Sequence, residues 1–188
     1  MKIAKLTSLL FASTLVAATT LSGCQSLQGQ MKTGNPFNQP QLKSTIQSVD
    51  GNHSNIGEMY LRQVDNGVQV YGQINGLQPN ATYALHIHET GSCNNAGKTA
   101  GGHFNPNNTA HGNPDDINSH AGDLPNITAD ANGVATMNYV KQGISVDMGA
   151  DNSVYRRAFI LHAGADDYQT QPSGDSGERI ACGVIEKN

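Results

Sequence analysis

Six of the chain's seven histidines, together with one aspartate, have the spacing of metal ligands. Neutral imidazole nitrogen is the commonest protein ligand for zinc and copper, and a carboxylate can complete such a site. Seven donors exceed what one tetrahedral ion needs and nearly suffice for two. The pattern therefore predicts two metal sites, one of which can support redox chemistry. The candidate ligands are His86, His88, His103, His111, His120, Asp123 and His162.

Three of these histidines belong to strand-like segments. His86 and His88 are two residues apart in the run 83–88, so the alternation of a strand places both imidazoles on one face. His162 ends another apolar segment and supplies a third imidazole. Copper prefers nitrogen ligands and changes its oxidation state, so this strand-based set suits copper.

The remaining donors come from irregular chain and offer three nitrogens and one oxygen, a set that suits a closed tetrahedral zinc site. Taken singly, each histidine is also compatible with an ordinary surface or hydrogen-bonded position, and we assign His53 to that class. The predicted zinc set is His103, His111, His120 and Asp123.

The segments that must position these ligands have the signals of β-structure. Asn-Gly pairs at 66–67 and 132–133 tolerate the positive φ values of tight hairpin turns. No helical period continues for as many as 12 residues, a length at which helices become recognisable. The sequence predicts strands at 56–64, 68–74, 83–88, 127–129, 134–137, 154–162 and 180–185.

Two long segments, 89–126 and 163–178, have no strand pattern, although they contain or adjoin most of the candidate ligands. Loops of this length are uncommon in compact domains unless they are functional. The predicted fold is therefore all-β, a Greek-key β-sandwich or flattened barrel with two long functional loops.

The N-terminus has the features of an export signal. A basic start with Lys2 and Lys5 precedes a short apolar run that ends in Leu-Ser-Gly-Cys24. This pattern predicts a signal peptide with a lipobox at 1–23 and lipidation of Cys24, although a plain signal peptide with an incidental cysteine is the alternative. Residues 24–44 are polar and contain two prolines, so we expect a flexible tether before a single domain at 45–188.

Charge and cysteine content narrow the classes of function. Removal of Lys2 and Lys5 with the signal changes the formal charge from −4 to −6, and no basic patch is present, which excludes a nucleic-acid binder. In an oxidising compartment the two remaining cysteines, Cys93 and Cys182, are expected to form a disulfide, with two buried free thiols as the alternative.

The ligand-bearing motifs resemble the copper/zinc superoxide dismutase family, in its bacterial periplasmic branch. The similarity extends over about 45–185 and consists of long motifs in a fixed order. The matching stretches are His-Ile-His-Glu at 86–89 with Gly-Ser-Cys at 91–93, Gly-Gly-His-Phe at 101–104, His-Ala-Gly-Asp-Leu-Pro at 120–125, Leu-His-Ala-Gly at 161–164, and the segment 174–185.

This resemblance implies a role for each residue. It implies that His103 bridges the two metals and that Arg179 guides superoxide to copper and orients it there. Asp166 matches a carboxylate that links ligands of the two metals, although a solvated loop aspartate is the alternative. The implied copper ligands are His86, His88, His103 and His162; the implied zinc ligands are His103, His111, His120 and Asp123; the implied disulfide is Cys93–Cys182.

Three positions differ from the family pattern. The family usually has glycine where Ala84 stands, an aromatic residue where Leu85 stands, and often glycine where Arg156 stands. These positions concern strand packing and local geometry, so the metal chemistry is expected to be unaffected.

The resemblance implies a superoxide dismutase that contains one copper and one zinc and yields dioxygen and hydrogen peroxide, with His103 and Arg179 as its catalytic residues. The alternatives are a periplasmic copper/zinc-buffering protein without turnover and an adhesive or structural lipoprotein module. We expect an exported, membrane-anchored lipoprotein, in the outer membrane because Gln25 is not the retention aspartate. Both a monomer and a homodimer are compatible with the sequence.

One feature of the sequence opposes the attraction of an anion. The segment between His162 and Arg179 contains several acids and no lysine, whereas fast capture of a small anion requires a locally positive approach. Lys98 is the nearest other cation in the ligand-bearing loops. We therefore predict that Lys98 lies near the channel mouth and steers superoxide, with a solvated lysine of no special role as the alternative.

Overall fold

The computed structural model describes residues 39–188. This part of the chain is built from short strands, with one 3₁₀ turn, η2 (Lys98–Ala100). The strands are β1 (Leu42–Ser48), β2 (Asn55–Val64), β3 (Gly67–Ile74), β4 (Thr82–Tyr83), β5 (Leu85–His88), β6 (Ile127–Thr128), β7 (Ala135–Lys141), β8 (Ala158–His162), β9 (Arg179–Val184) and β10 (Glu186–Lys187).

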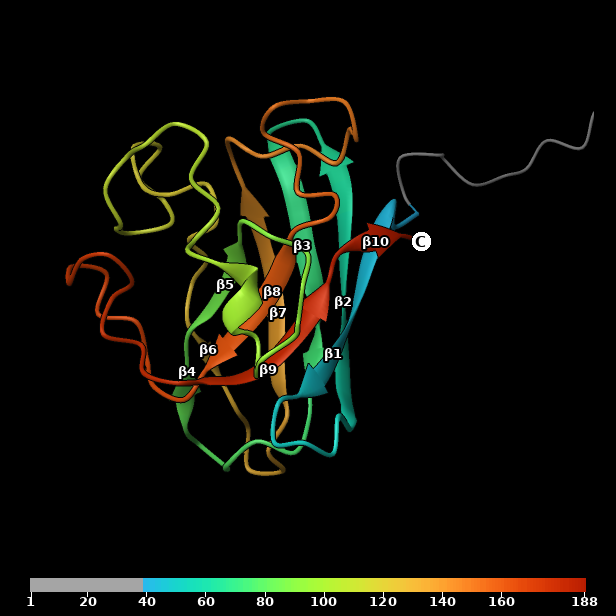
Figure 1. Ribbon diagram of the computed structural model, residues 1–188, viewed down its shortest axis with the longest axis vertical. Coiled ribbons are helices and arrows are strands. Elements are labelled where there is room, and N and C mark those ends of the chain that lie inside the picture. The colour runs from blue at the N-terminus through green and yellow to red at the C-terminus, as the bar shows by residue number, and fades with distance from the viewer. Residues whose placement is uncertain (1–38) are drawn as a thin grey trace, which may run out of the picture. The chain divides into compact units, whose positions relative to one another are not determined.

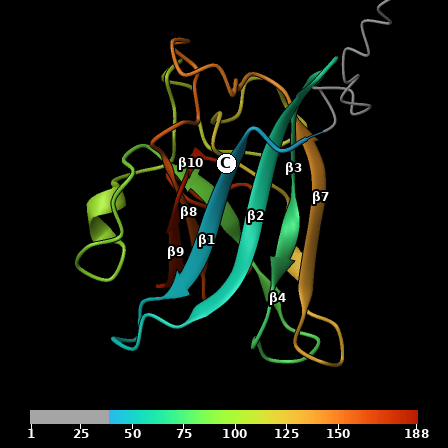
Figure 2. The same cartoon turned by 90° about the vertical axis from the view of Figure 1, so that its right-hand side faces the viewer.

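The strands form one curled antiparallel sheet with the order β5-β8-β9-β1-β2-β3-β7, while β10 pairs with β1. A second, two-stranded sheet pairs β4 with β6. In Figures 1 and 2 the large sheet curves round so that β8 and β9 face β3 and β7. The predicted all-β flattened barrel is confirmed.

Alternating side chains explain how the sheet closes around its core. In β1 the buried residues are Leu42, Ser44 and Ile46, with exposed polar residues between them. This is the pattern of an antiparallel strand with one wet face. β5 and β8 instead are buried at every position, because the core covers one face and the long loops cover the other.

The first predicted hairpin is confirmed: β2 and β3 pair up to Val64↔Gly67 across the turn at 65–66. The second is only partly correct. Its turn forms, with an isolated bridge between Ala129 and Ala135, but β6 pairs with β4 rather than with β7. β4 and β6 are each only two residues long, so they add little to the barrel wall.

The sheet begins earlier than the expected domain boundary at 45. β1 starts at Leu42, which is buried in the core, so 42–44 belong to the sheet and not to the tether. The predicted signal peptide, Cys24 and the tether up to residue 38 lie outside the described residues. Within the described part of the chain, no helix is long and apolar enough to cross a membrane.

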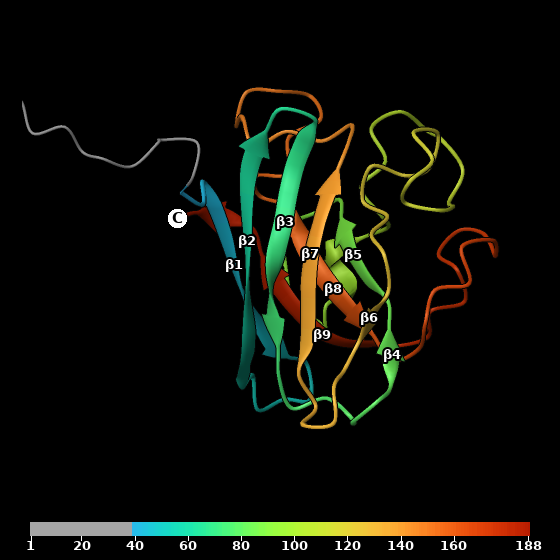
Figure 3. The same cartoon turned by 180° about the vertical axis from the view of Figure 1, so that it is seen from behind.

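The two predicted long loops are confirmed. Apart from η2 and isolated bridges, 89–126 and 163–178 have no regular structure. The later, yellow-green part of the first loop and the red second loop project from the barrel on the same side, near β4 and β5, whereas the part with η2 lies over β8 and β9 (Figures 1 and 3). Direct hydrogen bonds join the two loops, for example from the backbone N–H of His111 to the side chain of Gln171.

Candidate metal centre

Six histidines and Asp123 form one buried cluster, as the sequence predicted. Their donor atoms separate into two groups of four, and within each group the atoms lie within 4.8 Å of one another. The groups have His103 in common. The first contains His86, His88, His103 and His162; the second contains His103, His111, His120 and Asp123.

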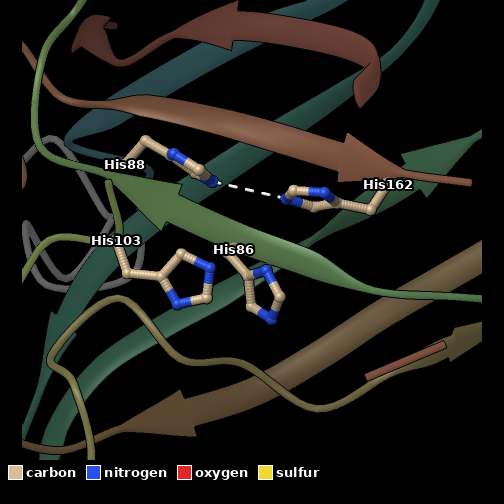
Figure 4. Close-up of side chains that lie close together, drawn as sticks. All are labelled: His86, His88, His103 and His162. Carbon is tan, nitrogen blue, oxygen red and sulfur yellow. Dashed lines mark hydrogen bonds between the residues drawn. The ribbon is translucent and has the colours of Figure 1, made fainter. Parts of the chain in front are cut away.

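The first group is positioned mainly by strands. His86 and His88 lie on β5, and β8 pairs with β5 and ends at His162. His103 joins the same region through an isolated bridge to His88. Figure 4 shows the four rings gathered beside β5, with those of His88 and His162 facing each other.

Hydrogen bonds on the outer nitrogens set the tautomers of this group. His88 Nδ1–H donates to Gly101 O at 2.9 Å, and His162 Nδ1–H donates to Gly177 O at 3.1 Å. Each ring therefore presents the lone pair of Nε2, and these two nitrogens lie 3.4 Å apart. A hydrogen bond that fixes the opposite nitrogen is typical of metal-binding histidine.

The other two rings leave buried nitrogens unpaired. Within residues 39–188, His86 Nδ1 and His103 Nε2 find no hydrogen-bond partner. A buried polar atom without a partner is costly in free energy, so it calls for a ligand. Two Nε2 lone pairs that face each other and two orphaned nitrogens fit a nitrogen-coordinated ion such as copper.

The second group surrounds Asp123, whose side chain is fully buried. The Oδ1 atom of Asp123 lies 2.8 Å from Nδ1 of His103, 3.0 Å from that of His111 and 3.4 Å from that of His120. The Nδ1 atoms of His103 and His120 are also 3.4 Å apart. A tetrahedral zinc ion with bonds of about 2.0–2.1 Å holds its ligands about 3.3 Å from one another, so the donor set fits zinc.

Backbone groups fix the orientation of the Asp123 carboxylate. Its Oδ2 atom accepts hydrogen bonds from the N–H of Gly112 at 3.1 Å and of His120 at 3.0 Å. Oδ1 is thereby turned toward the three imidazoles. The short spacing between His120 and Asp123 produces this orientation. The two residues belong to one turn, in which the His120 N–H reaches the Asp123 carboxylate and the Asp123 N–H reaches the His120 carbonyl.

A second carboxylate, Asp166, connects the two groups. Its Oδ2 atom accepts from His86 Nε2 at 2.8 Å, and its Oδ1 atom accepts from His111 Nε2 at 2.9 Å. The residue is buried. The expected contact of Asp166 with a ligand in each group is therefore present, which excludes the alternative of a solvated loop aspartate.

Burial determines the charge of the strand-based rings. Desolvation lowers the pKa of His86 to about 3, that of His88 to about 2 and that of His162 to about 4. All three values lie below the ordinary 6.5 even though hydrogen bonds oppose the shift. These imidazoles are therefore neutral near pH 7, the form that binds a metal.

His111 behaves differently because it lies between two carboxylates. Burial lowers its pKa, but the hydrogen bonds to Asp123 and Asp166 outweigh burial and raise the pKa to about 9. Burial likewise opposes ionisation of both carboxyls, but hydrogen bonds to histidines outweigh it and hold their pKa values well below the ordinary range. Two ionised carboxylates thus lie within the cluster and offset the charge of bound cations.

Arg179, the first residue of β9, lies beside the first group. Its guanidinium donates to Gly97 O at 2.5 Å and to Gly101 O at 2.6 Å. Gly101 O also accepts from His88, so one carbonyl orients both the imidazole and the guanidinium. Burial lowers the pKa of Arg179, yet the group stays charged near pH 7 because arginine does not deprotonate in proteins.

The predicted disulfide is confirmed. Cys93 and Cys182 are bonded, with Cα atoms 5.7 Å apart, and join the 89–103 segment to β9. Closure of a loop of this size contributes about 4.6 kcal/mol in the chain-entropy model. The bond therefore fixes the segment that carries His103 close to the strand that carries Arg179.

Lys98 begins η2 and is exposed. Arg179 binds carbonyls on both sides of it, at Gly97 and Gly101, so the backbone of Lys98 is held close to the arginine. That Lys98 steers superoxide toward the metal groups stays a prediction.

Of the residues that differ from the family pattern, Arg156 has a structural consequence. It adopts φ 60°, a left-handed conformation that glycine accepts most easily. Ala84 and Leu85 are fully buried at the start of β5. All three positions lie outside the two donor groups.

Sequence reasoning missed the residues that hold the loops together. Asn126 accepts from the N–H of Asp166 at 2.8 Å and donates to its carbonyl at 2.9 Å. Gln171 makes the same pair of contacts with His111. Gly174 has φ 70° and packs against the Asp166–His111 contact. No spacing rule identifies such contacts between loops.

A buried lysine was also missed. The ammonium of Lys141, at the end of β7, donates to Pro114 O at 2.9 Å and to Ser119 Oγ at 3.3 Å. These contacts hold the 105–120 segment against the barrel. A lysine at the end of a strand is ordinarily exposed, so its sequence position did not indicate this role.

Known proteins resemble this chain over nearly all of the described region. The copper/zinc superoxide dismutase (SODC) family model matches residues 55–185. "Superoxide dismutase [Cu-Zn] 1" of Aquifex aeolicus is 38% identical, over 77% of this chain and 88% of that protein. The superoxide dismutase-like protein YojM of Bacillus subtilis is 35% identical, over 91% of this chain and 92% of its own length.

A solved structure supports the same relationship. The crystal structure of a SOD-like protein from Bacillus subtilis has 35% identity and a TM-score of 0.69, and the match covers 76% of this chain and 96% of that one. Identity at this level over a shared fold reflects common descent. Together with the two donor groups, these matches show that the chain belongs to the copper/zinc superoxide dismutase family.

Proposed function

We propose that this chain is a superoxide dismutase that converts two superoxide anions and two protons into one dioxygen and one hydrogen peroxide. The observation that carries the proposal is the convergence of seven buried donors on two points that have His103 in common. Family membership alone is weaker support, because one relative is named only superoxide dismutase-like.

The donor chemistry assigns one metal to each group. The four-nitrogen group of His86, His88, His103 and His162 would hold copper, and the group of His103, His111, His120 and Asp123 would hold zinc. Copper bound there would supply one-electron exchange in both directions, and zinc would stabilise the loop and the shared ring. One copper and one zinc per chain are expected.

Arg179 would orient the substrate. Two of its N–H groups are used by Gly97 and Gly101, and a guanidinium has five donors in a planar fork. The remaining donors of a permanently charged group can bind a small anion beside the nitrogens of His88 and His162. The two carbonyls prevent the side chain from rotating, so the anion is oriented as well as attracted.

His103 would handle the proton. Its Nδ1 faces Asp123, while its Nε2 is buried without a hydrogen-bond partner within the described residues. Burial lowers the pKa of His103, so a proton that arrives at Nε2 is readily passed on. A buried nitrogen of this kind can receive a proton and deliver it to the departing peroxide.

The alternative is a metal-buffering protein, which needs the donors but not Arg179. To separate the two, we would load purified protein with copper and zinc, measure both metals per chain, and follow the loss of superoxide. Arg179→Met should retain both metals and lower the second-order rate constant about tenfold or more, since electrostatic guidance of substrates contributes at least that much.

One result would decide against the enzyme, and a second would decide against the role of Arg179. Wild-type protein with one copper and one zinc that consumed superoxide no faster than free buffer would favour metal buffering. An unchanged rate in Arg179→Met at full metal content would remove the arginine from the mechanism. Lys43→Met, on the outer face of β1, is the matched control for the loss of one positive charge.

We also propose that the mature protein is anchored to a membrane through lipidated Cys24, with 24–38 as part of a tether. The support is the Leu-Ser-Gly-Cys pattern after a basic, apolar N-terminus. In a bacterial host that processes lipoproteins, wild-type protein should partition into detergent and carry the lipid mass. Cys24→Ala should abolish both properties, and a wild-type protein without the lipid mass would refute the anchor.

A further inference from the structure

The side-chain amide of Gln171 makes hydrogen bonds to both polar groups of the His111 backbone, the N–H and the carbonyl. The His111 N–H donates to Gln171 Oε1 at 2.9 Å, and Gln171 Nε2 donates to His111 O at 2.8 Å. A neighbouring strand makes this pair of bonds to a residue in an antiparallel ladder. Neither residue belongs to a strand, so one carboxamide replaces the missing partner strand.

His111 has few other means of keeping its position. Its ring is fixed from both ends, because Nδ1 faces Asp123 at 3.0 Å and Nε2 faces Asp166 at 2.9 Å. Its backbone, however, lies in the irregular 105–120 segment. The N–H and carbonyl of this buried residue need partners, and both partners come from the other long loop.

Asp166, the other member of the His111–Asp166 hydrogen bond, has its backbone bound in the same way by a side-chain amide. Asn126 accepts from the Asp166 N–H at 2.8 Å and donates to the Asp166 carbonyl at 2.9 Å. The two loops are therefore joined crosswise: a side chain from 163–178 holds the histidine, and a side chain from 89–126 holds the carboxylate. Displacement of either loop would misplace both members of the bond.

We propose that Gln171 is a positioning residue of the zinc site, which keeps the 163–178 loop in place over His111 and thereby slows the release of zinc. The inference rests on the zinc assignment made for the proposed function. Gln171 acts through His111 and does not touch the metal. Its outer side is exposed, so substitutions there need not disturb the core.

The test uses zinc-loaded, copper-free protein and three variants. Gln171→Met keeps the size of the side chain and removes both hydrogen bonds. Gln171→Glu can still accept from the His111 N–H but cannot donate to its carbonyl. Gln169→Ala is the matched control, because Gln169 is an exposed glutamine of the same loop whose hydrogen bonds to Asp167 and Gln171 use its backbone. Zinc release is followed with an excess of a chromophoric chelator.

We expect Gln171→Met to release zinc about tenfold faster than wild type, the lower end of the loss that follows removal of a ligand's supporting partner. Gln171→Glu should also release zinc faster, although its added negative charge would by itself retain a cation. The visible absorption of cobalt bound in place of zinc should shift in both variants and stay unchanged in Gln169→Ala. In the Gln171 variants the melting temperature should fall less in the metal-free protein than in the zinc-loaded protein, and in Gln169→Ala it should stay at the wild-type value in both.

Several outcomes would overturn the inference. Wild-type release rates in both Gln171 variants would do so, and so would equal acceleration in Gln169→Ala. A drop in the metal-free melting temperature as large as the drop with zinc would show a merely structural contact. Superoxide does not enter these measurements, so wild-type protein that holds zinc but has no turnover would refute the proposed function and leave the role of Gln171 standing.

Discussion

The two donor groups differ in what holds them in place. In the first, His86, His88 and His162 stand on β5 and β8, whose ladder runs from Leu85↔Leu161 to His88↔Ala158. In the second, His111, His120 and Asp123 lie outside any strand. The backbone of the sheet fixes the first group, whereas the second is fixed mainly by hydrogen bonds that its own members make.

This difference predicts how each group responds to its metal. Strand residues are held by ladder bonds and by core packing, for example of the fully buried Phe159 and Leu161 on the strand that ends at His162. Loop residues lack ladder hydrogen bonds and core packing, so they gain their order from polar contacts and from the bound ion, as in metal-dependent folding. Loss of zinc should therefore loosen the loops, while loss of copper should leave the sheet almost unchanged.

The largest effect is expected from removal of one ligand in each region. Asp123→Ala should abolish zinc binding and, with zinc at about a thousandfold excess over its Kd, lose about 4 kcal/mol of stabilisation, which corresponds to about 10 °C in Tm. His86→Ala should lose copper and superoxide turnover while retaining zinc. Elemental analysis and calorimetric melting measure both results.

His53→Ala is the control for this pair, because His53 is exposed and lies outside both groups. If Asp123→Ala and His86→Ala bound both metals normally, the assignment of the two groups would be wrong. If His86→Ala lowered Tm as much as Asp123→Ala, the contrast between a rigid strand site and a metal-ordered loop site would fail.

A smaller loss of zinc affinity is expected from a substitution that replaces no ligand. A Cβ atom at Gly174 would lie 1.7 Å from Asp166 Oδ1 and 2.8 Å from His111 Nε2, and φ at this position is 70°. Gly174→Ala should therefore push Asp166 away from His111 and weaken zinc about 10- to 100-fold. Competition with a zinc chelator measures this.

Gly112→Ala provides the comparison for Gly174→Ala. Gly112 follows a ligand directly, but a Cβ atom there would meet only Ser119 at 3.8 Å, an ordinary contact. Its zinc affinity should stay close to that of wild type. Similar losses in both variants would show that general loop flexibility, rather than the Asp166–His111 contact, controls zinc binding.

The contrast between the two regions also explains which features were predictable. Alternation placed His86 and His88 on one face of a strand, and the structure confirms that both belong to one donor group. The β2–β3 hairpin follows from its Asn-Gly turn. Both are local consequences of strand periodicity, so the sequence contains them directly.

Contacts between distant segments could not be predicted in this way. The side-chain amide of Asn126 binds the backbone of Asp166, 40 positions away, and that of Gln171 binds the backbone of His111, 60 positions away. No local sequence rule predicts such pairs. The start of β1 at Leu42 was missed because the prolines at 36 and 40 make the preceding chain look like linker. The pairing of β6 with β4 instead of β7 depends on barrel closure, a property of the whole fold.

A more moderate effect is expected in the number of protons that zinc displaces from His111 on binding. The raised pKa of about 9 means that the ring contributes stability to the metal-free protein below about pH 6.5 and that this contribution is lost as pH rises through about 9. Zinc binds the neutral ring, so it must displace a proton below about pH 9. Binding at about pH 7 should release about one proton and at about pH 9 about half a proton.

Calorimetry in buffers with different ionisation enthalpies measures the number of protons released. Asp166→Asn removes one of the two carboxylates that raise the pKa of His111, so its zinc binding should release fewer protons near neutral pH. Proton release that does not change between neutral and alkaline pH in the wild-type protein would contradict the position of His111 between two ionised carboxylates. The strand histidines, which have lowered pKa values, should add nothing in this range.

The smallest effect concerns the approach of the substrate, where the two long loops differ in their charged residues. The 163–178 loop has exposed Asp167 and Asp175 and no lysine or arginine, whereas the disulfide-linked 89–103 segment has exposed Lys98 as well as Glu89. Arg179 binds the carbonyls of Gly97 and Gly101 on either side of this lysine. An anion that is repelled by the first loop should therefore enter along the second.

Lys98→Glu should lower the second-order rate constant with superoxide by about two- to fivefold at about 0.01 M ionic strength, where charges interact over about 30 Å. The effect should shrink at about 0.1 M, because screening shortens that range to about 10 Å. Lys43→Glu makes the same change in net charge on the outer face of β1, so it separates local steering from overall charge. If the two variants had equal rates across the salt series, Lys98 would have no special role, and Arg179 with the bound metals would provide the attraction.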